Sequence, residues 1–190
     1  MLKSITIKQK IYFLAILGTV LAGYISYTSI SAIKSVGHKL KQIAEEDIEI
    51  LEVATLFHDI GYLSGYFDHE DRSKQIAAEF LKKQAYPSEK IAKVEQLIEA
   101  TKADYEPQTK LEEIIKDADL YNLASPDYEL YAQKLRLEWE HYLNNDSSDK
   151  KWFKENQQFL KNHDYYTEAA NEIFSDQKKK NYKNLMLEKL

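Results

Sequence analysis

A histidine and an aspartate stand side by side at the end of an apolar stretch: His58-Asp59 follows Leu51–Phe57 and precedes Gly61. Imidazole nitrogens and carboxylate oxygens are ligands of divalent metal ions. The apolar run favours a buried helix that carries the pair at its C-terminal end and stops at the glycine. Such a dipeptide also arises by chance, and a second one, His163-Asp164, lies in a polar context. The apolar run therefore favours His58-Asp59, and not the second pair, as part of a metal site.

Two further acids, Asp117 and Asp119, lie among apolar residues on a predicted helix. A buried carboxylate is costly unless it meets a cation or a hydrogen-bond donor, so one of them could share a metal ion with His58-Asp59. Residues separated by one position point about 200° apart on a helix, so only one acid is expected to face that ion. The competing interpretation is that both acids are solvated, or that one pairs with a lysine.

Three other residues give weaker signals. His69 and Glu70 stand at a helix start, where acidic residues commonly complement the helix dipole, but they could also serve as a general acid and base or support a metal ligand. Arg136 could bind a phosphate, although an arginine beside glutamates on a helix is more often part of a surface ion pair. We expect His163 to be structural.

Helices must position these side chains. Only 5 glycines and 3 prolines occur, and apolar residues recur at helical spacing without any useful alternating pattern, so the sequence predicts an all-α fold. Thr109 and Glu112 have the spacing of a capping box, and Ser125-Pro126 reads as a helix start. After the helix that ends at Gly61, in a left-handed conformation, we expect further helices over 73–83, 88–98, 111–123, 126–143, 150–162 and 165–188.

Composition and charge exclude several classes of protein. The absence of cysteine excludes disulfides, thiolate metal sites and thiol catalysis. Residues 1–44 contain six lysines and no acid, whereas the whole chain has a net charge of −5, so residues 45–190 carry −11. Because nucleic-acid binding needs clustered positive charge, we expect no nucleic-acid partner.

The N-terminal region contains 23 uncharged residues, 11–33, with lysines on both sides. A helix of that length can cross a hydrocarbon core of about 30 Å. A signal peptide cleaved after Val20-Leu21-Ala22 is the alternative, but the apolar run continues past that point, which favours a retained anchor. We therefore predict a membrane anchor and juxtamembrane segment over 1–47, followed by a helical domain over 48–190. The lysines do not decide the orientation.

Residues 1–47 resemble the N-terminus of bacterial methyl-accepting chemotaxis receptors, in particular at Ile5–Lys10 and Ser35–Leu40. The resemblance implies a single transmembrane helix in the bacterial inner membrane. Receptor signalling is not implied, because neither a ligand-sensing region nor a signalling coiled coil follows.

Residues 48–190 resemble the HD superfamily of metal-dependent phosphohydrolases, and most closely a bacterial group described as predicted phosphohydrolases. The matching segments, in order, are Ala54–Tyr62, His69-Glu70 with Ser73, Ile98–Thr101, Asp117–Leu120, Leu135–Trp139, and the tail from Phe159 through Thr167 to Asn181. The resemblance implies an HD-type helical bundle after the transmembrane helix. Only this resemblance favours the cytoplasmic side of the membrane for the helical domain.

The resemblance also implies roles for these residues. His58, Asp59 and Asp119 would hold a divalent metal ion (Mn²⁺, Mg²⁺, Fe²⁺ or Zn²⁺), with Asp117 the second choice for the last position. The expected reaction is hydrolysis of a phosphorylated small molecule, for which a nucleotide is one candidate, by a metal-activated water. In that reaction His69 and Glu70 would be catalytic and Arg136 would bind substrate.

One feature of the family pattern is missing. The family has a further histidine ligand about thirty residues before the His-Asp pair, where this chain has the predicted membrane span, with Ser26 near the expected position. His38 is about ten residues too close. The sequence therefore also allows an impaired phosphohydrolase, in which His38 or water replaces the ligand, a non-catalytic membrane-tethered sensory or binding module, or a truncated fusion.

Overall fold

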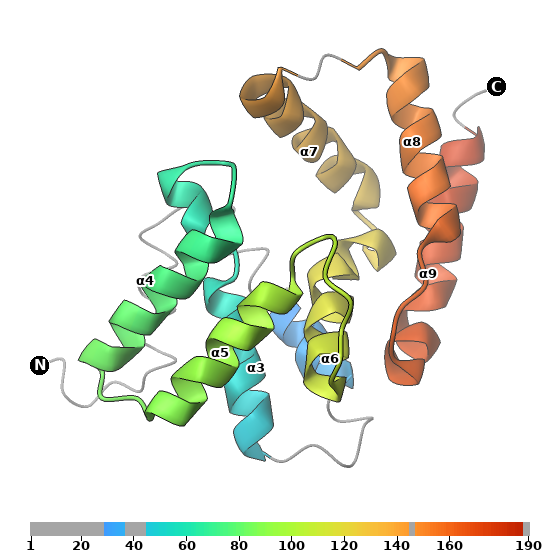
Figure 1. Ribbon diagram of the computed structural model, residues 1–190. Coiled ribbons are helices and arrows are strands. Elements are labelled where there is room, and N and C mark those ends of the chain that lie inside the picture. The colour runs from blue at the N-terminus through green and yellow to red at the C-terminus, as the bar shows by residue number, and fades with distance from the viewer. Residues whose placement is uncertain (1–28, 37–44, 145–146, 188–190) are drawn as a thin grey trace, which may run out of the picture. The chain divides into compact units, whose positions relative to one another are not determined.

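The computed structural model describes residues 29–36, 45–144 and 147–187. The chain divides into two compact units, Met1–Asp119 and Leu120–Leu190 (Figure 1). Throughout the described ranges the regular elements are helices and no strand occurs, so the predicted all-α class is confirmed.

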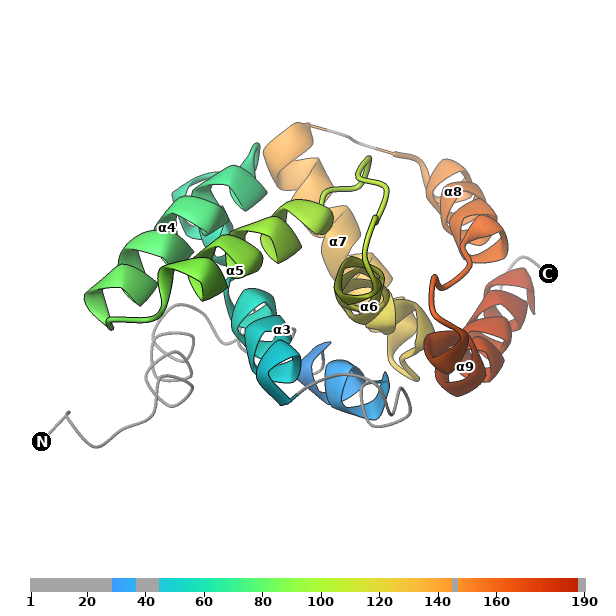
Figure 2. The same cartoon turned by 60° about the horizontal axis from the view of Figure 1, so that its bottom comes forward.

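The first unit is built around α3 (Glu45–Phe57), which packs against the helices that follow it in the chain (Figure 2). Its residues Ile50–Phe57 are all buried, which confirms that the apolar run belongs to a central helix. The elements that follow are η1 (Ile60–Ser64), a 3₁₀ helix, then α4 (His69–Lys83), α5 (Ser88–Ala100) and α6 (Lys110–Asp119). The helices α4 and α5 lie side by side.

The predicted membrane span receives no support from the described residues. Most of it, 11–28, lies outside them, and its last five residues belong to helix 29–36. There Ile30, Ala32 and Ile33 are buried, and the ammonium of Lys34 lies 3.7 Å from the carboxylate of Glu52 on α3. Nowhere in the described ranges is a helix both long enough and apolar enough to cross a bilayer.

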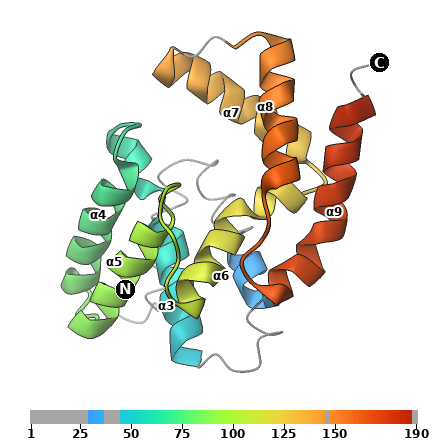
Figure 3. The ribbon, with the colours of Figure 1, turned by 45° about the vertical axis from the view of Figure 1, so that its right-hand side comes forward.

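The second unit contains η2 (Leu120–Ala124), a 3₁₀ helix, followed by α7 (Tyr128–Leu143), α8 (Asp149–Asn162) and α9 (Glu168–Leu187). The helices α8 and α9 pack together, and η2 contacts both α7 and α9 (Figure 3). Asn181 fixes one of these contacts because its buried amide donates to the carbonyls of Leu123 and Ser125, both at 2.8 Å. The buried apolar core consists of Leu123, Tyr128, Ala132, Trp152, Leu160 and Leu185.

The start signals predicted from the sequence had mixed outcomes. The capping box before α6 is confirmed: the amide of Thr109 donates to the carboxylate of Glu112 at 2.9 Å, and the amide of Glu112 donates back to the Thr109 hydroxyl at 3.3 Å. The predicted helix start at Ser125-Pro126 is wrong, since α7 begins at Tyr128. The Ser125 hydroxyl accepts from the amide of Asp127 and so forms a local turn instead of a helix cap.

Candidate functional site

His58 lies at the end of α3 and is buried, with 2% of its surface exposed. Its amide donates to the carbonyl of Ala54 at 2.9 Å, so the residue continues the helical hydrogen bonding beyond Phe57. The imidazole Nδ1 lies 2.7 Å from the carbonyl oxygen of Thr55. A carbonyl oxygen only accepts, so Nδ1 carries a proton and Nε2 is the nitrogen that faces the site.

Two carboxylates face that nitrogen. Nε2 of His58 lies 3.2 Å from Oδ2 of Asp59 and 3.1 Å from Oδ1 of Asp119, the last residue of α6. Of the two acids separated by one position, Asp119 is therefore the one that reaches His58, whereas Asp117 is buried, with 1% of its surface exposed. The fold brings together all three residues predicted to bind metal, from segments that lie sixty residues apart in sequence.

The two carboxylates of this cluster stabilise a positive charge at Nε2 of His58. Burial acts to lower the pKa of His58, but the charge of Asp59 and hydrogen bonds to Asp119 and Asp59 outweigh it and hold that pKa well above its usual range. Burial acts to raise the pKa of Asp59, but the opposing effect of His58, with a smaller one from His69, lowers it. Without another cation, His58 supplies the charge as an imidazolium. A metal ion can take its place, because Nε2 then offers its lone pair.

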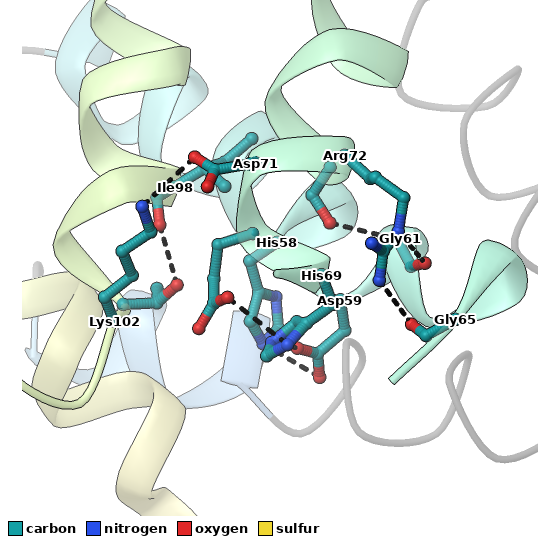
Figure 4. Close-up of polar contacts among 12 residues, drawn as sticks. His58, Asp59, Gly61, Gly65, His69, Asp71, Arg72, Ile98 and Lys102 are labelled. Atoms are coloured by element: carbon teal, nitrogen blue, oxygen red, sulfur yellow. Dashed lines mark hydrogen bonds and ion pairs between the residues drawn. The ribbon is translucent and has the colours of Figure 1, made fainter. Parts of the chain in front are cut away.

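His69 and Glu70 extend the cluster. His69 is the first residue of α4, and its Nε2 lies 3.6 Å from Oδ1 of Asp59 (Figure 4). Its Nδ1 lies 3.3 Å from Oε2 of Glu70. The imidazole also stacks on Tyr62, with ring centroids 3.8 Å apart and an interplanar angle of 16°. The fold thus places both predicted acid/base residues beside the metal-site candidates, together with the ring of Tyr62, which no sequence pattern indicated.

Gly61 holds η1 against the first turn of α4, which is not its predicted role. It does not end α3 in a left-handed conformation; instead, a Cβ on Gly61 would lie 1.9 Å from the carbonyl oxygen of His69. Its amide donates to the Ser73 hydroxyl at 2.8 Å. Arg72 donates to the carbonyl of Gly61 at 3.2 Å and to that of Gly65 at 2.5 Å, as Figure 4 shows. These contacts fix His69 relative to His58-Asp59.

An ion-pair network fixes α4 against α5. The ammonium of Lys102 lies 3.1 Å from Asp71 on α4 and 2.8 Å from Glu99 on α5, and Lys74 pairs with the same two acids. Asp71, Lys74 and Glu99 also line a surface groove of about 650 Å³, together with Gln75, Glu95 and Gln96. None of the candidate metal ligands lines this groove, and two of its acids, Asp71 and Glu99, are held in the ion pairs with Lys74 and Lys102.

Arg136, the predicted substrate residue, belongs to the second unit. Its guanidinium donates to Glu140 at 3.1 Å, to Asp149 at 2.7 Å and to the carbonyl of Ser147 at 2.6 Å. These bonds tie α7 to the start of α8. A role in binding phosphate stays a prediction.

As a metal site, His58, Asp59 and Asp119 have suitable donor atoms but an incomplete arrangement. In donor chemistry they fit, since an imidazole with a carbonyl on its far nitrogen and two carboxylates is a common ligand set. In arrangement they are incomplete, because no group of three or more His, Asp or Glu side chains within the described ranges is placed to hold a metal ion. The family's additional histidine has no counterpart in helix 29–36, and His38 lies outside the described residues.

Comparison with known proteins identifies the class. The family model of the HD domain matches residues 29–123, half of the chain, so this protein belongs to the HD domain family. No curated protein and no solved structure matches it significantly. The match begins inside the segment predicted to be a membrane anchor, and the resemblance of that segment to chemotaxis receptors has no support.

Proposed function

We propose that this protein is a metal-dependent phosphohydrolase that cleaves a phosphate ester of a small molecule. The observation that carries the proposal is the convergence of Asp59 and Asp119 on Nε2 of His58, whose other ring nitrogen is held by a backbone carbonyl. That arrangement gathers negative charge around one nitrogen lone pair, which is what a divalent cation requires. Membership of the HD domain family supports it.

In this proposal His58, Asp59 and Asp119 hold the ion, which supplies a Lewis acid for the phosphoryl oxygen and makes water more acidic. His69 stands next to Asp59 at 3.6 Å and contacts Glu70 at 3.3 Å. An imidazole between two carboxylates can accept a proton at one nitrogen while a contact at the other nitrogen fixes the orientation of the ring. We therefore assign His69 and Glu70 to proton transfer at the attacking or leaving oxygen.

A second candidate function is a non-catalytic sensory or binding module, tethered to the membrane if residues 11–33 act as an anchor. The absence of a three-residue metal group from the described ranges favours it. In that case the His58 imidazolium serves permanently as the cation of the cluster, and the carboxylates are structural.

Metal analysis and turnover separate the two functions. The full chain, purified without chelator, is expected to hold about one divalent ion and to release phosphate from a panel of phosphomonoesters. His58→Ala should lose both, whereas the same change at His163 should alter neither. Protein without bound metal after incubation with Mn²⁺, Mg²⁺, Fe²⁺ and Zn²⁺, or turnover that survives His58→Ala, would refute the phosphohydrolase proposal and leave the binding module.

A further inference from the structure

The end of α5 lies between two helices of the first unit that carry parts of the candidate site. These helices are α4, which begins at His69, and α6, which ends at Asp119. The helix α5 packs against both of them. A short turn, 84–87, joins α4 to α5, and the two helices lie side by side, so the end of α5 lies beside the start of α4 (Figure 2). Residues at the end of α5 can therefore set the separation of His69 and Asp119.

The side chain of Lys102, just after α5, reaches the first turn of α4. Its ammonium lies 3.1 Å from Oδ1 of Asp71, two residues after His69, and 2.8 Å from Oε1 of Glu99 on α5 (Figure 4). A hydrogen bond to Glu99, with a smaller contribution from Asp71, outweighs burial and raises the pKa of Lys102. The side chain is therefore a cation at neutral pH, and it holds the start of α4 to the end of α5.

The backbone of the same residue contacts α6. The carbonyl of Lys102 accepts a hydrogen bond from the ammonium of Lys116 at 2.7 Å. Lys116 lies three residues before Asp119, on the same side of α6, and only 8% of its surface is exposed. A buried ammonium is costly unless it is hydrogen-bonded, so this contact stabilises the packing of α6 against the end of α5. Residue 102 thus contacts α4 through its side chain and α6 through its carbonyl.

Lys74 provides a contrast within the same ion-pair network. Its ammonium lies 2.7 Å from Asp71 and also pairs with Glu99, so it ties α4 to α5 as Lys102 does. The two side chains are similarly accessible, at 24% and 26% exposure. None of the contacts of Lys74 within the described residues reaches α6. Either lysine can stabilise the pairing of α4 with α5, but only Lys102 connects that pair to the helix that carries Asp119.

We propose that Lys102 and Lys116 are positioning residues that together hold His69 and Asp119 at a fixed separation. We call their two contacts, Lys102 to Asp71 and Lys116 to the Lys102 carbonyl, the lysine brace. This inference rests on the proposed function, which gives His69 and Asp119 their roles, but the brace itself involves no metal ion. Because the two contacts act in series, loss of either should release the geometry, and loss of both should cost little more.

Imidazole NMR signals of the metal-free full chain test the brace without turnover. His69 stacks on Tyr62, so the ring current of the tyrosine shifts the CH protons of that imidazole upfield. Lys102→Met should reduce this upfield shift, and Lys116→Met should move the signals of His58, which contacts the last residue of α6. Replacing a buried cation with an apolar group of similar volume is often tolerated, so we expect folded variants, which circular dichroism verifies.

Two further variants are the controls. Lys102→Arg keeps the charge and the donors, so it should restore the wild-type signals. Lys74→Met removes a lysine from the same network and should move the signals of His58 and His69 less than the two test variants do. Signals of His69 that are unchanged in Lys102→Met, or shifts of equal size in Lys74→Met, would overturn the brace. If Lys116→Met does not fold, the comparison of Lys102→Met with Lys102→Arg decides.

Phosphate release measures the consequence for the proposed reaction. A misplacement of about 1 Å can cost about 100-fold in rate, so Lys102→Met and Lys116→Met should each lower kcat by about 10- to 100-fold. The double variant should fall no more than about twofold below the slower single variant, whereas independent effects would multiply. A multiplicative loss would overturn the series arrangement. Absence of phosphate release from the wild-type chain would refute the proposed function alone, because the metal-free imidazole signals still decide the brace.

Discussion

The chain contains two His-Asp dipeptides, and the fold gives them opposite electrostatic environments. His58-Asp59 ends a buried helix of the first unit, and both Asp59 and Asp119 lie within 3.2 Å of the imidazole. His163-Asp164 lies between α8 and α9 of the second unit, where the carboxylate of Asp164 is 94% exposed. The neighbour of His163 is Lys178, whose ammonium lies 3.4 Å from Nδ1 and also donates to the His163 carbonyl.

The consequence appears in the protonation of the two imidazoles. The pKa of His58 is raised well above its usual range because two carboxylates outweigh the effect of burial. Burial, reinforced by the charge of Lys178, lowers the pKa of His163 to about 4. The same dipeptide thus gives two different results. In the first unit the carboxylates around His58 stabilise a cation, whereas in the second unit His163 is a neutral, structural imidazole. What differs is the third residue, Asp119 in one case and Lys178 in the other.

Neutralising the two aspartates in turn is the most direct test of whether the two His-Asp dipeptides differ in function. Asp59→Asn removes a charge that faces His58, His69 and the proposed ion, and we expect phosphate release to fall at least about 100-fold. Asp164→Asn changes an exposed carboxylate 3.9 Å from Lys178 and should leave turnover within a factor of two. Phosphate release at saturating metal is the measurement. Equal losses in both variants would show that the dipeptides are not functionally distinct.

The sequence predicted this difference only in part. The apolar run before His58 correctly indicated a central helix, since eight consecutive buried residues leave a readable pattern. Helical periodicity also showed that Asp117 and Asp119 point apart, although the choice between them came from the family resemblance. Neither pattern reveals that Lys178 faces His163, because that contact joins two helices across a turn.

Two other failures have physical causes. An uncharged run is equally suited to a bilayer and to a protein core, so the sequence could not show that Ile30 and Ile33 are buried in a short helix. Tyr62 and Arg72 were not selected because their roles depend on how η1 packs against α4. No spacing rule within one helix reports such a contact. The boundary at residue 48 stays a prediction, although the HD domain match begins at residue 29.

The close packing around Gly61 gives the next largest expected effect. Gly61→Ala would place a methyl group against the carbonyl of His69, so η1 or α4 must shift. We expect a loss of about 2–3 kcal/mol in the free energy of unfolding. Ser64→Ala, at the exposed end of the same 3₁₀ helix, is the matched control and should cost less than about 0.5 kcal/mol. Urea denaturation measures both. A neutral Gly61→Ala would mean that the first dipeptide is less tightly positioned than its contacts indicate.

The smallest effect concerns His163 and acid. Its pKa is about 4 in the folded chain and about 6.5 when unfolded, so the unfolded state binds more protons between these values. The stability contributed by the neutral imidazole is therefore complete above pH 6.5 and is lost as the pH falls towards 4. Because the imidazole is only partly buried, solvent screening makes this loss smaller than that expected for Gly61→Ala. His163→Gln keeps an acceptor for Lys178 but cannot titrate, so it should flatten this part of the stability profile. Urea denaturation from pH 4 to 7 measures the slope, and an unchanged slope in the variant would assign the acid sensitivity to other groups. A flattened slope would establish that His163 serves the fold by remaining uncharged, whereas His58 lies in a cluster of charged groups.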